Sequence, residues 1–520
     1  MSVHRTRRQF LADVGRGALV ASVGLGLASE LGFAPAFADE PSDVLDFGAL
    51  EPLVALMQET GADRLLSVLV DRLRAGTELR TLLTAAALAN ARTFGGEDYV
   101  GFHTMVALGP AWHMSTELDE RRRALPVLKV LYRNSARVQE FGGRKNEVLR
   151  AVAPGALPAG RVGGEVLRDA VRAKDLAAAE GTFATLAEGT ADATLNHLLY
   201  AVEDGAEVHR VALAYRAWEL SSVIGAEHAR TLLRQSVRYC LKEEKGRNGT
   251  PWGQVRTLLP ELLERHHLLS AKPGTLPADD AWIESTSRAI FEASPEDAAE
   301  SAAAALEEGR APDAVGEAIS LAANQILLRD RGRPASEERP GKPPGSVHGD
   351  SIGLHASDSA NAWRSMARAG TPRNVFACLI LGAYQVARDR VSRGGDFLHW
   401  TAVPLAEDAA KVTATDPAAL LREADEAIRA RDQARASAVV DRWGRLDLPP
   451  APVFGLLLGF AVSEDGALHA EKYYRTVVEE FAATRASLRW RHPVALARVT
   501  ASEFGTRAAG YEEACHLLGV

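Results

Sequence analysis

The stretch EDGAEVHRVALAYRAWE, residues 203–219, decides the fold, because a second stretch, EDGALHAEKYYRTVVEE at residues 464–480, repeats its plan. Each stretch opens with an acidic turn, reaches a histidine a few residues later, and continues with apolar residues at helical spacing. We therefore expect His209 and His469 to occupy equivalent positions near the start of two related helices.

The similarity extends outward from these two stretches. VRAKDLAAAE at residues 171–180 and IRARDQARAS at residues 428–437 precede them in the same register, over about 50 residues. Two weaker copies follow the same plan and end at His103 and His355. The sequence thus predicts four degenerate helical repeats, at about residues 66–115, 168–220, 296–366 and 425–482.

The composition of these repeats is typical of helices. Ala, Leu, Arg and Glu dominate, apolar residues recur every three or four positions, and alternating β-branched runs are scarce. We expect an all-α protein whose four repeats pack as an arc or a closed α/α ring. The third repeat contains an inserted loop, residues 329–350, rich in Pro, Gly and charge, which is predicted to lie on the surface either as a lid or as a disordered segment.

The N-terminal segment, residues 1–38, resembles a twin-arginine (Tat) signal peptide. Arg7 and Arg8 precede a weakly apolar run at residues 18–32, and Ala36-Phe37-Ala38 has the small-x-small pattern of a cleavage site. The resemblance implies a partner, the Tat translocon, and a mature all-α domain at residues 39–520 that is periplasmic or secreted.

The net charge and the hydropathy narrow the class of protein. The chain has a formal net charge of −8, and cleavage would change this to about −10, because the removed piece carries four Arg and two acids. No clustered basic face predicts binding to nucleic acid. No later run of 18 uncharged apolar residues occurs, so we do not expect a transmembrane protein after cleavage.

The repeats place one histidine each near the start of a helix, and these are the candidate metal ligands: His103, His209, His355 and His469. An Asp precedes each histidine and is expected to cap its helix: Asp98, Asp204, Asp350 and Asp465. The positive end of a helix dipole disfavours a charged imidazole, so we expect the histidines to be neutral, which is the state that binds metals.

The third repeat is the most polar around its histidine. Asp358 and Ser359 follow His355 by three and four residues, so they share its helix face and are candidate catalytic residues. Imidazole ligands suit Fe, Cu or Zn, and the sequence leaves the choice among these transition metals open. Cys240, Cys378 and Cys515 are widely separated and odd in number, so we expect neither disulfides nor a cysteine metal site.

The histidine-bearing segments HTMVALGPAW and HRVALAYRAWE are similar to those of questin oxidase-like proteins. That resemblance implies a helical oxygenase that opens rings by Baeyer–Villiger-type chemistry with a nicotinamide cofactor. An export signal separates this chain from that family, because an exported oxidase would not meet NADPH. The expectation carried over is that histidines from repeated helices line one cavity.

Two functions follow from the sequence. One is an exported metal-dependent enzyme, an oxidoreductase rather than a hydrolase, acting on a small-molecule substrate. The alternative is a non-catalytic helical-repeat binding scaffold in the cell envelope. In the enzyme the four histidines should lie within about 10 Å of one another, whereas in a scaffold each would pack within its own repeat.

Overall fold

The computed structural model describes residues 44–246, 253–349, 351–392 and 394–520. The chain divides into two units, Met1–Leu45 and Asp46–Val520. The predicted signal peptide, residues 1–38, lies outside the described residues. The fold is all-α: 71% of the chain is helical, and within the described residues only isolated β-bridges occur and no strand.

Twenty of the α-helices fall into four sets of five. The first set is α3 (Glu51–Glu59), α4 (Ala62–Arg74), α5 (Leu79–Phe94), α6 (Tyr99–Glu117) and α7 (Leu125–Phe141). The second is α8 (Gly163–Arg172), α9 (Leu176–Leu186), α10 (Ala191–Val202), α11 (Val208–Ile224) and α12 (Ala229–Gly246). The third is α14 (Asp280–Glu292), α15 (Pro295–Glu307), α16 (Pro312–Arg329), α17 (Ile352–Arg368) and α18 (Pro372–Ser392). The fourth is α20 (Pro417–Arg429), α21 (Gln433–Arg445), α22 (Ala451–Ser463), α23 (His469–Ala483) and α24 (Arg491–Glu503).

The same contacts recur in every set. The third helix contacts the first, the fourth and the fifth helix of its set. The fifth helix also contacts the second and the fourth. The predicted repeats lie inside these sets and leave out the fifth helix. Three further helices stand outside the pattern: α13 (Gln254–Arg265), α19 (Ala406–Lys411) and α25 (Tyr511–Leu518).

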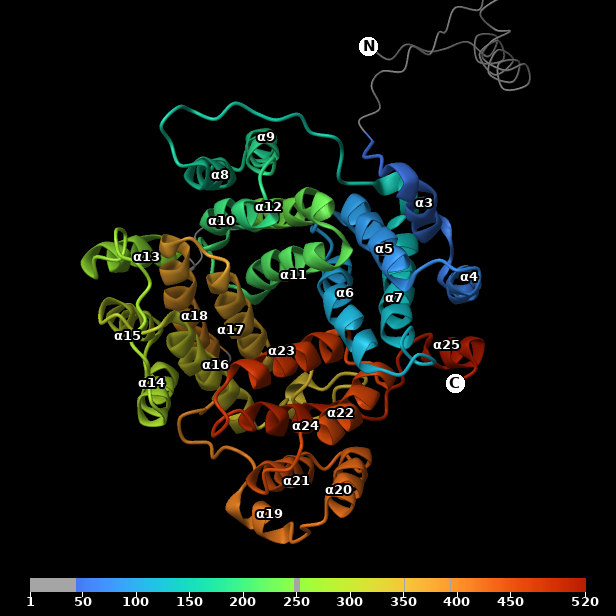
Figure 1. Ribbon diagram of the computed structural model, residues 1–520, viewed down its shortest axis with the longest axis vertical. Helices are drawn as coiled ribbons and strands as arrows, with labels where there is room; N and C mark the ends of the chain where they lie inside the picture. The colour runs from blue at the N-terminus through green and yellow to red at the C-terminus, as the bar shows by residue number, and fades with distance from the viewer. Residues whose placement is uncertain (1–43, 247–252, 350, 393) are drawn as a thin grey trace, which may run out of the picture. The chain divides into compact units, whose positions relative to one another are not determined.

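The fourth helix of each set carries the histidine and lies deep inside the unit. In α6 and α11 most residues on every face are buried, which is typical of a helix surrounded by other helices. Figure 1 shows α6, α11, α17 and α23 around a common centre. Contacts link α6 to α11, α11 to α17, α17 to α23, and α23 back to α6, so the four helices form a closed circuit.

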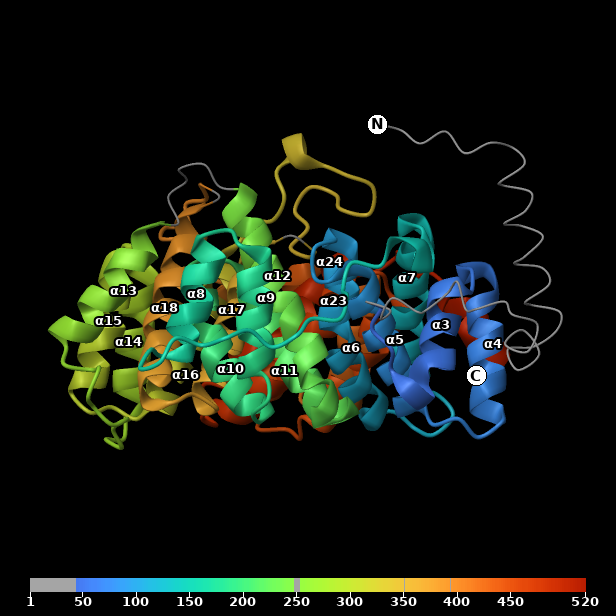
Figure 2. The same cartoon turned by 90° about the horizontal axis from the view of Figure 1, so that it is seen from above.

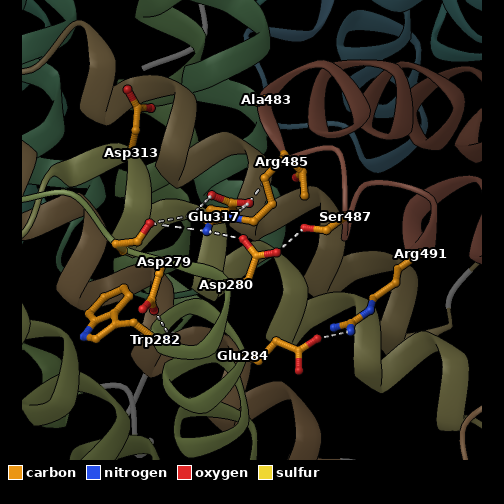
Figure 3. A network of polar contacts seen from close by, with 12 residues as sticks. Asp279, Asp280, Trp282, Glu284, Asp313, Glu317, Ala483, Arg485, Ser487 and Arg491 are labelled. Carbon is orange, nitrogen blue, oxygen red and sulfur yellow. Dashed lines mark hydrogen bonds and ion pairs between the residues drawn. The ribbon is translucent and has the colours of Figure 1, made fainter.

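A polar network joins the third set to the fourth (Figure 3). Arg485, in the connection between α23 and α24, contacts Glu317 of α16 at 2.9 Å and Asp280 of α14 at 2.8 Å. The backbone N–H of Arg485 also donates to Glu317, and Ser487 donates to Asp280 at 2.6 Å. Glu317 is buried, so this network anchors the connection that follows α23.

The inserted loop of the third repeat has a defined course from residue 330 to residue 349. Figure 2 shows the segment, drawn in yellow, projecting beyond the helix ends. The backbone N–H of Val347 donates to the Ser502 hydroxyl of α24, and His348 Nδ1 lies 2.7 Å from the same oxygen. These contacts fasten the end of the loop to the fourth set just before α17 begins.

Two further features of the described chain are the state of its cysteines and the apolar character of its helices. Cys240, Cys378 and Cys515 are free thiols, as the sequence predicts. Among the described residues, no helix combines the length and the apolar character that a membrane crossing requires.

Candidate functional site

The four candidate histidines meet at the centre of the helix circuit. His103 is the fifth residue of α6, His209 the second of α11, His355 the fourth of α17 and His469 the first of α23. The imidazole centroids are 5.4 Å apart for His103 and His209, 5.8 Å for His209 and His355, 5.4 Å for His355 and His469, and 5.1 Å for His469 and His103. The helices therefore bring together four residues that the sequence spreads from 103 to 469.

His103 and His209 are held by one nitrogen and leave the other without a partner. Nδ1 of His103 lies 2.7 Å from the carbonyl oxygen of Tyr99, and Nδ1 of His209 contacts the Glu207 carboxylate. Both partners accept hydrogen bonds, which places the proton on Nδ1 and the lone pair on Nε2. Both Nε2 atoms are buried and have no hydrogen-bond partner.

His355 and His469 face each other through the same atom. Their Nε2 atoms are 3.3 Å apart, and Nδ1 of His469 lies 3.2 Å from the carbonyl oxygen of Ala467. That contact places the proton of His469 on Nδ1, so its Nε2 also presents a lone pair. The lone pairs of three imidazoles are thus assigned to Nε2 by their other contacts.

The donor set fits a transition-metal ion in its chemistry. Ligand histidines almost always donate their other N–H to a carbonyl or a carboxylate, as His103, His209 and His469 do here. In a tetrahedral shell with bonds of about 2.0–2.1 Å, the ligand nitrogens are about 3.3 Å apart. The Nε2 atoms of His355 and His469 already have this separation.

The coordination shell is not preformed. Across the described ranges of the chain, no three His, Cys, Asp or Glu side chains are already arranged closely enough to hold one metal ion. To enclose one, the imidazoles of His103 and His209 would have to turn or shift toward the pair formed by His355 and His469.

The environment favours the neutral imidazole at His103 and His469. Burial, together with the nearby positive charge of Lys472, lowers the pKa of His103 to about 2. Burial also places the pKa of His469 well below its usual value, again with Lys472 contributing. These shifts agree with the expectation that the imidazoles of His103 and His469 are neutral.

Glu207 caps the N-terminus of α11, the role that the sequence predicts for Asp204. Its carboxylate accepts from the backbone N–H of Arg210 and so caps α11, while it also holds His209. Burial opposes ionisation of Glu207, but His209 and the helix N–H groups outweigh it and lower its pKa to about 2. Asp204 instead pairs with Arg172 at 2.6 Å, so its predicted capping role is wrong.

The other acidic turns differ as well. Asp98 caps α6 as predicted, accepting from the backbone N–H of Gly101 at 2.7 Å. Asp465 does not cap α23: Leu468 occupies the cap position, and Asp465 pairs with Arg133 at 2.9 Å. Asp350 lies outside the described residues.

One turn below the histidines, two charged groups lie in the helix circuit. Asp358 of α17 and Lys472 of α23 each follow a site histidine by three residues, so each shares its face. Asp358 is buried and accepts a hydrogen bond from Thr476 at 2.8 Å. Burial raises the pKa of Asp358 and lowers that of Lys472 to about 8. The same spacing that selects Asp358 in the sequence would have identified Lys472.

Ser359 serves to position its helix. Its hydroxyl donates to the backbone carbonyl of His355 at 2.8 Å and accepts from Gln385 of α18 at 2.7 Å. Gln385 in turn accepts from the indole N–H of Trp363. These contacts occupy the Ser359 hydroxyl and support the helix turn that carries His355.

The four histidines differ in their exposure to solvent. His103 and His469 are each 5% exposed, whereas His209 and His355 are partly exposed. Tyr99 is 61% exposed, and its ring centroid lies 4.4 Å from that of His103 and 5.6 Å from that of His209. Tyr99, His209 and His355 are therefore the more exposed members of this group.

Protein-family models, curated proteins and solved structures give no match for the chain.

Proposed function

We propose that this protein is an exported metal-dependent enzyme, an oxidoreductase, in which His103, His209, His355 and His469 hold one transition-metal ion. The observation that carries the proposal is the convergence of four imidazoles, two of which, His103 and His209, have their Nδ1 atoms engaged and their buried Nε2 atoms without a hydrogen-bond partner. Leaving such nitrogens buried without a partner costs free energy, which a bound ion would offset.

The all-imidazole donor set favours redox chemistry over hydrolysis. Hydrolytic zinc sites keep three protein ligands and one open position for water, whereas four histidines would fill a tetrahedral shell. Iron and copper accept further ligands beyond four, so Fe or Cu bound here could still take a substrate. The resemblance of the histidine helices to questin oxidase-like proteins agrees with an oxidative role and stays a prediction.

The residues around the cluster have separable roles in this proposal. Glu207 and the carbonyls of Tyr99 and Ala467 would fix the orientation of three imidazoles. Asp358, with a pKa raised by burial, would exchange a proton with a substrate bound one helix turn below the ion. A small molecule would enter beside Tyr99.

A binding scaffold remains the alternative function, and the distances between the histidines speak against it. In a scaffold, each histidine would pack among the residues of its own repeat. Here each imidazole lies within 5.8 Å of imidazoles from two other repeats.

The test is elemental analysis of the protein purified from the exported fraction of its native host. We expect one Fe or Cu per chain in the native protein and less than about a tenth of that in a His355→Gln, His469→Gln double variant. The matched control is His492→Gln, because His492 is equally buried on α24 and contacts Thr484 instead of the cluster.

Three outcomes are distinguishable. Fe or Cu lost only in the double variant supports the proposal. If the protein contains stoichiometric zinc, and its removal lowers the unfolding temperature and changes nothing else, the cluster is a structural metal site. No metal in any of the three proteins, with equal unfolding temperatures, would overturn the metal site and favour the scaffold.

A further inference from the structure

A serine and a histidine outside the four-histidine cluster are in contact at the end of the inserted loop. Ser502 belongs to the last turn of α24, and His348 lies in the loop, just before α17. Nδ1 of His348 is 2.7 Å from Oγ of Ser502, and both residues are buried. The proposed metal site uses neither residue, so this pair has to be explained separately.

The direction of the hydrogen bond between the two side chains can be assigned. Nε2 of His348 lies 3.1 Å from the backbone carbonyl oxygen of Gly341, which can only accept, so the proton is on Nε2 and the lone pair is on Nδ1. The Ser502 oxygen already accepts from the backbone N–H of Val347 at 2.9 Å. The hydroxyl hydrogen of Ser502 therefore points to Nδ1 of His348, which is the orientation in which an imidazole can take up the proton.

The inserted loop supplies the group that orients the imidazole. Arg339 and Lys342 exchange backbone hydrogen bonds of 3.2 and 2.9 Å and so close a tight turn. Gly341 lies in this turn with φ of 73°, a value that favours glycine, and its carbonyl oxygen meets His348. A hydroxyl group, a base in contact with it and a third group that orients the base form the arrangement that activates a serine as a nucleophile.

Ser502 also borders an open cavity of about 650 Å³. This volume is typical of sites for small molecules. Apolar and cationic side chains line the same cavity: Pro340, Pro343, Phe504, Arg339 and Arg431. Both arginines are exposed, and a guanidinium group stabilises the negative charge that develops on a carbonyl oxygen under attack.

We propose that Ser502 and His348 form a second site, independent of the proposed metal site, that hydrolyses small carboxylic esters. Oγ of Ser502 bonds to the carbonyl carbon of the ester while its proton moves to Nδ1 of His348. The C–O bond to the alcohol then breaks, and the alcohol takes that proton and leaves the acyl group on Ser502. Water attacks the acyl group by the same route, which releases the acid and restores the hydroxyl group.

The experiment treats the full-length protein with a fluorophosphonate, which a reactive serine attacks at phosphorus with loss of fluoride, and maps the adduct by mass spectrometry. Hydrolysis of p-nitrophenyl acetate is measured in parallel, with and without EDTA. We expect one adduct per chain, on Ser502, and a hydrolysis rate that EDTA leaves unchanged. Ser502→Ala should abolish the adduct and lower hydrolysis by about a hundredfold or more, and His348→Gln should slow both reactions to a similar degree.

The matched control is Thr484→Ala. Oγ1 of Thr484 lies 3.2 Å from Nε2 of His492, and both residues are buried, so this variant also breaks a contact between a hydroxyl group and an imidazole. Thr484 does not line the cavity that Ser502 borders, so the variant should hydrolyse the ester within about twofold of the native rate. If Ser502→Ala does not fold, the adduct on the native protein decides the question, because mass spectrometry identifies the labelled residue directly.

Each outcome distinguishes this site from the proposed metal site. An adduct on Ser502, with hydrolysis that is lost in Ser502→Ala, supports the proposal. A native protein that forms no adduct on Ser502, or hydrolysis that Ser502→Ala retains, overturns it. An adduct on Ser502 without turnover of the ester overturns the esterase activity. Hydrolysis that EDTA abolishes depends on a metal ion, so it would overturn the serine site and leave the metal site standing.

Discussion

Glu503, the last residue of α24, is a buried carboxyl group with one oxygen that has no hydrogen-bond partner. Burial raises its pKa to about 8; Lys129 opposes this shift, and Glu471 reinforces it. The folded protein therefore holds this proton at pH values where the unfolded chain has released it. Between about pH 4.5 and pH 8, the folded state binds more protons, so stability falls as pH rises.

A Glu503→Gln variant tests this assignment at the residue scale. Glutamine mimics the neutral carboxyl group, so at pH 5 the variant should unfold at nearly the native temperature. At pH 8.5 it should be more stable than the native protein by up to a few kcal/mol, because it has no proton to lose. Thermal unfolding of both proteins across this range is the measurement, and parallel pH profiles would contradict the prediction.

Individual residues also show how far the sequence could be interpreted. The four histidines could be predicted because duplication keeps helix positions in register, and Asp358 could be predicted from its spacing to His355. Glu207 could not, because Asp204 is an equally good capping residue and only the exact start of α11 decides between them. Lys472 follows His469 by three residues, as Asp358 follows His355, so the same spacing could have predicted it.

Arg485 illustrates what holds helices of different sets together. It connects the segment after α23 to α14 and α16 through Asp280 and Glu317 (Figure 3). Arg485→Ala would leave the buried Glu317 carboxylate with little compensation, and we expect the free energy of unfolding to fall by about 3 kcal/mol. Chemical denaturation measures this difference.

The control for that prediction is Arg368→Ala. Arg368 pairs with Asp313, also on α16, but both side chains are largely exposed. Removing an exposed pair should cost about 0–1 kcal/mol. Equal losses for the two arginine variants would show that the buried network does not anchor the connection.

The sequence predicts that the secondary structure is helical, but it does not predict how many helices each repeat contains. Helical periodicity correctly predicts an all-α protein. The fifth helix of each set, such as α7 or α12, was left out of the predicted repeats because it does not carry the histidine that recurs at one repeat position. Its place is set by packing against the second, third and fourth helices, which a linear pattern does not reveal.

For the whole molecule, the helix circuit predicts that a bound ion stabilises all four sets together. An ion that binds only the folded state adds stability according to its concentration and affinity. Hydrogen exchange with and without Co²⁺ should show added protection at the start of α6, α11, α17 and α23, and little change in α13, α19 or α25. Protection confined to one set would contradict a site shared among four.

The contact between α6 and α23 closes the circuit and joins the first set of helices to the last. A repeat protein that merely stacks can lose a terminal unit and keep the rest, since each unit touches only its neighbours. Here a nascent chain has made His103 long before it makes His469, and until α23 emerges the cluster lacks one of its four members. The histidine cluster is therefore completed only near the end of synthesis, and a frameshift or stop shortly before α23 would leave most of the polypeptide without a complete cluster.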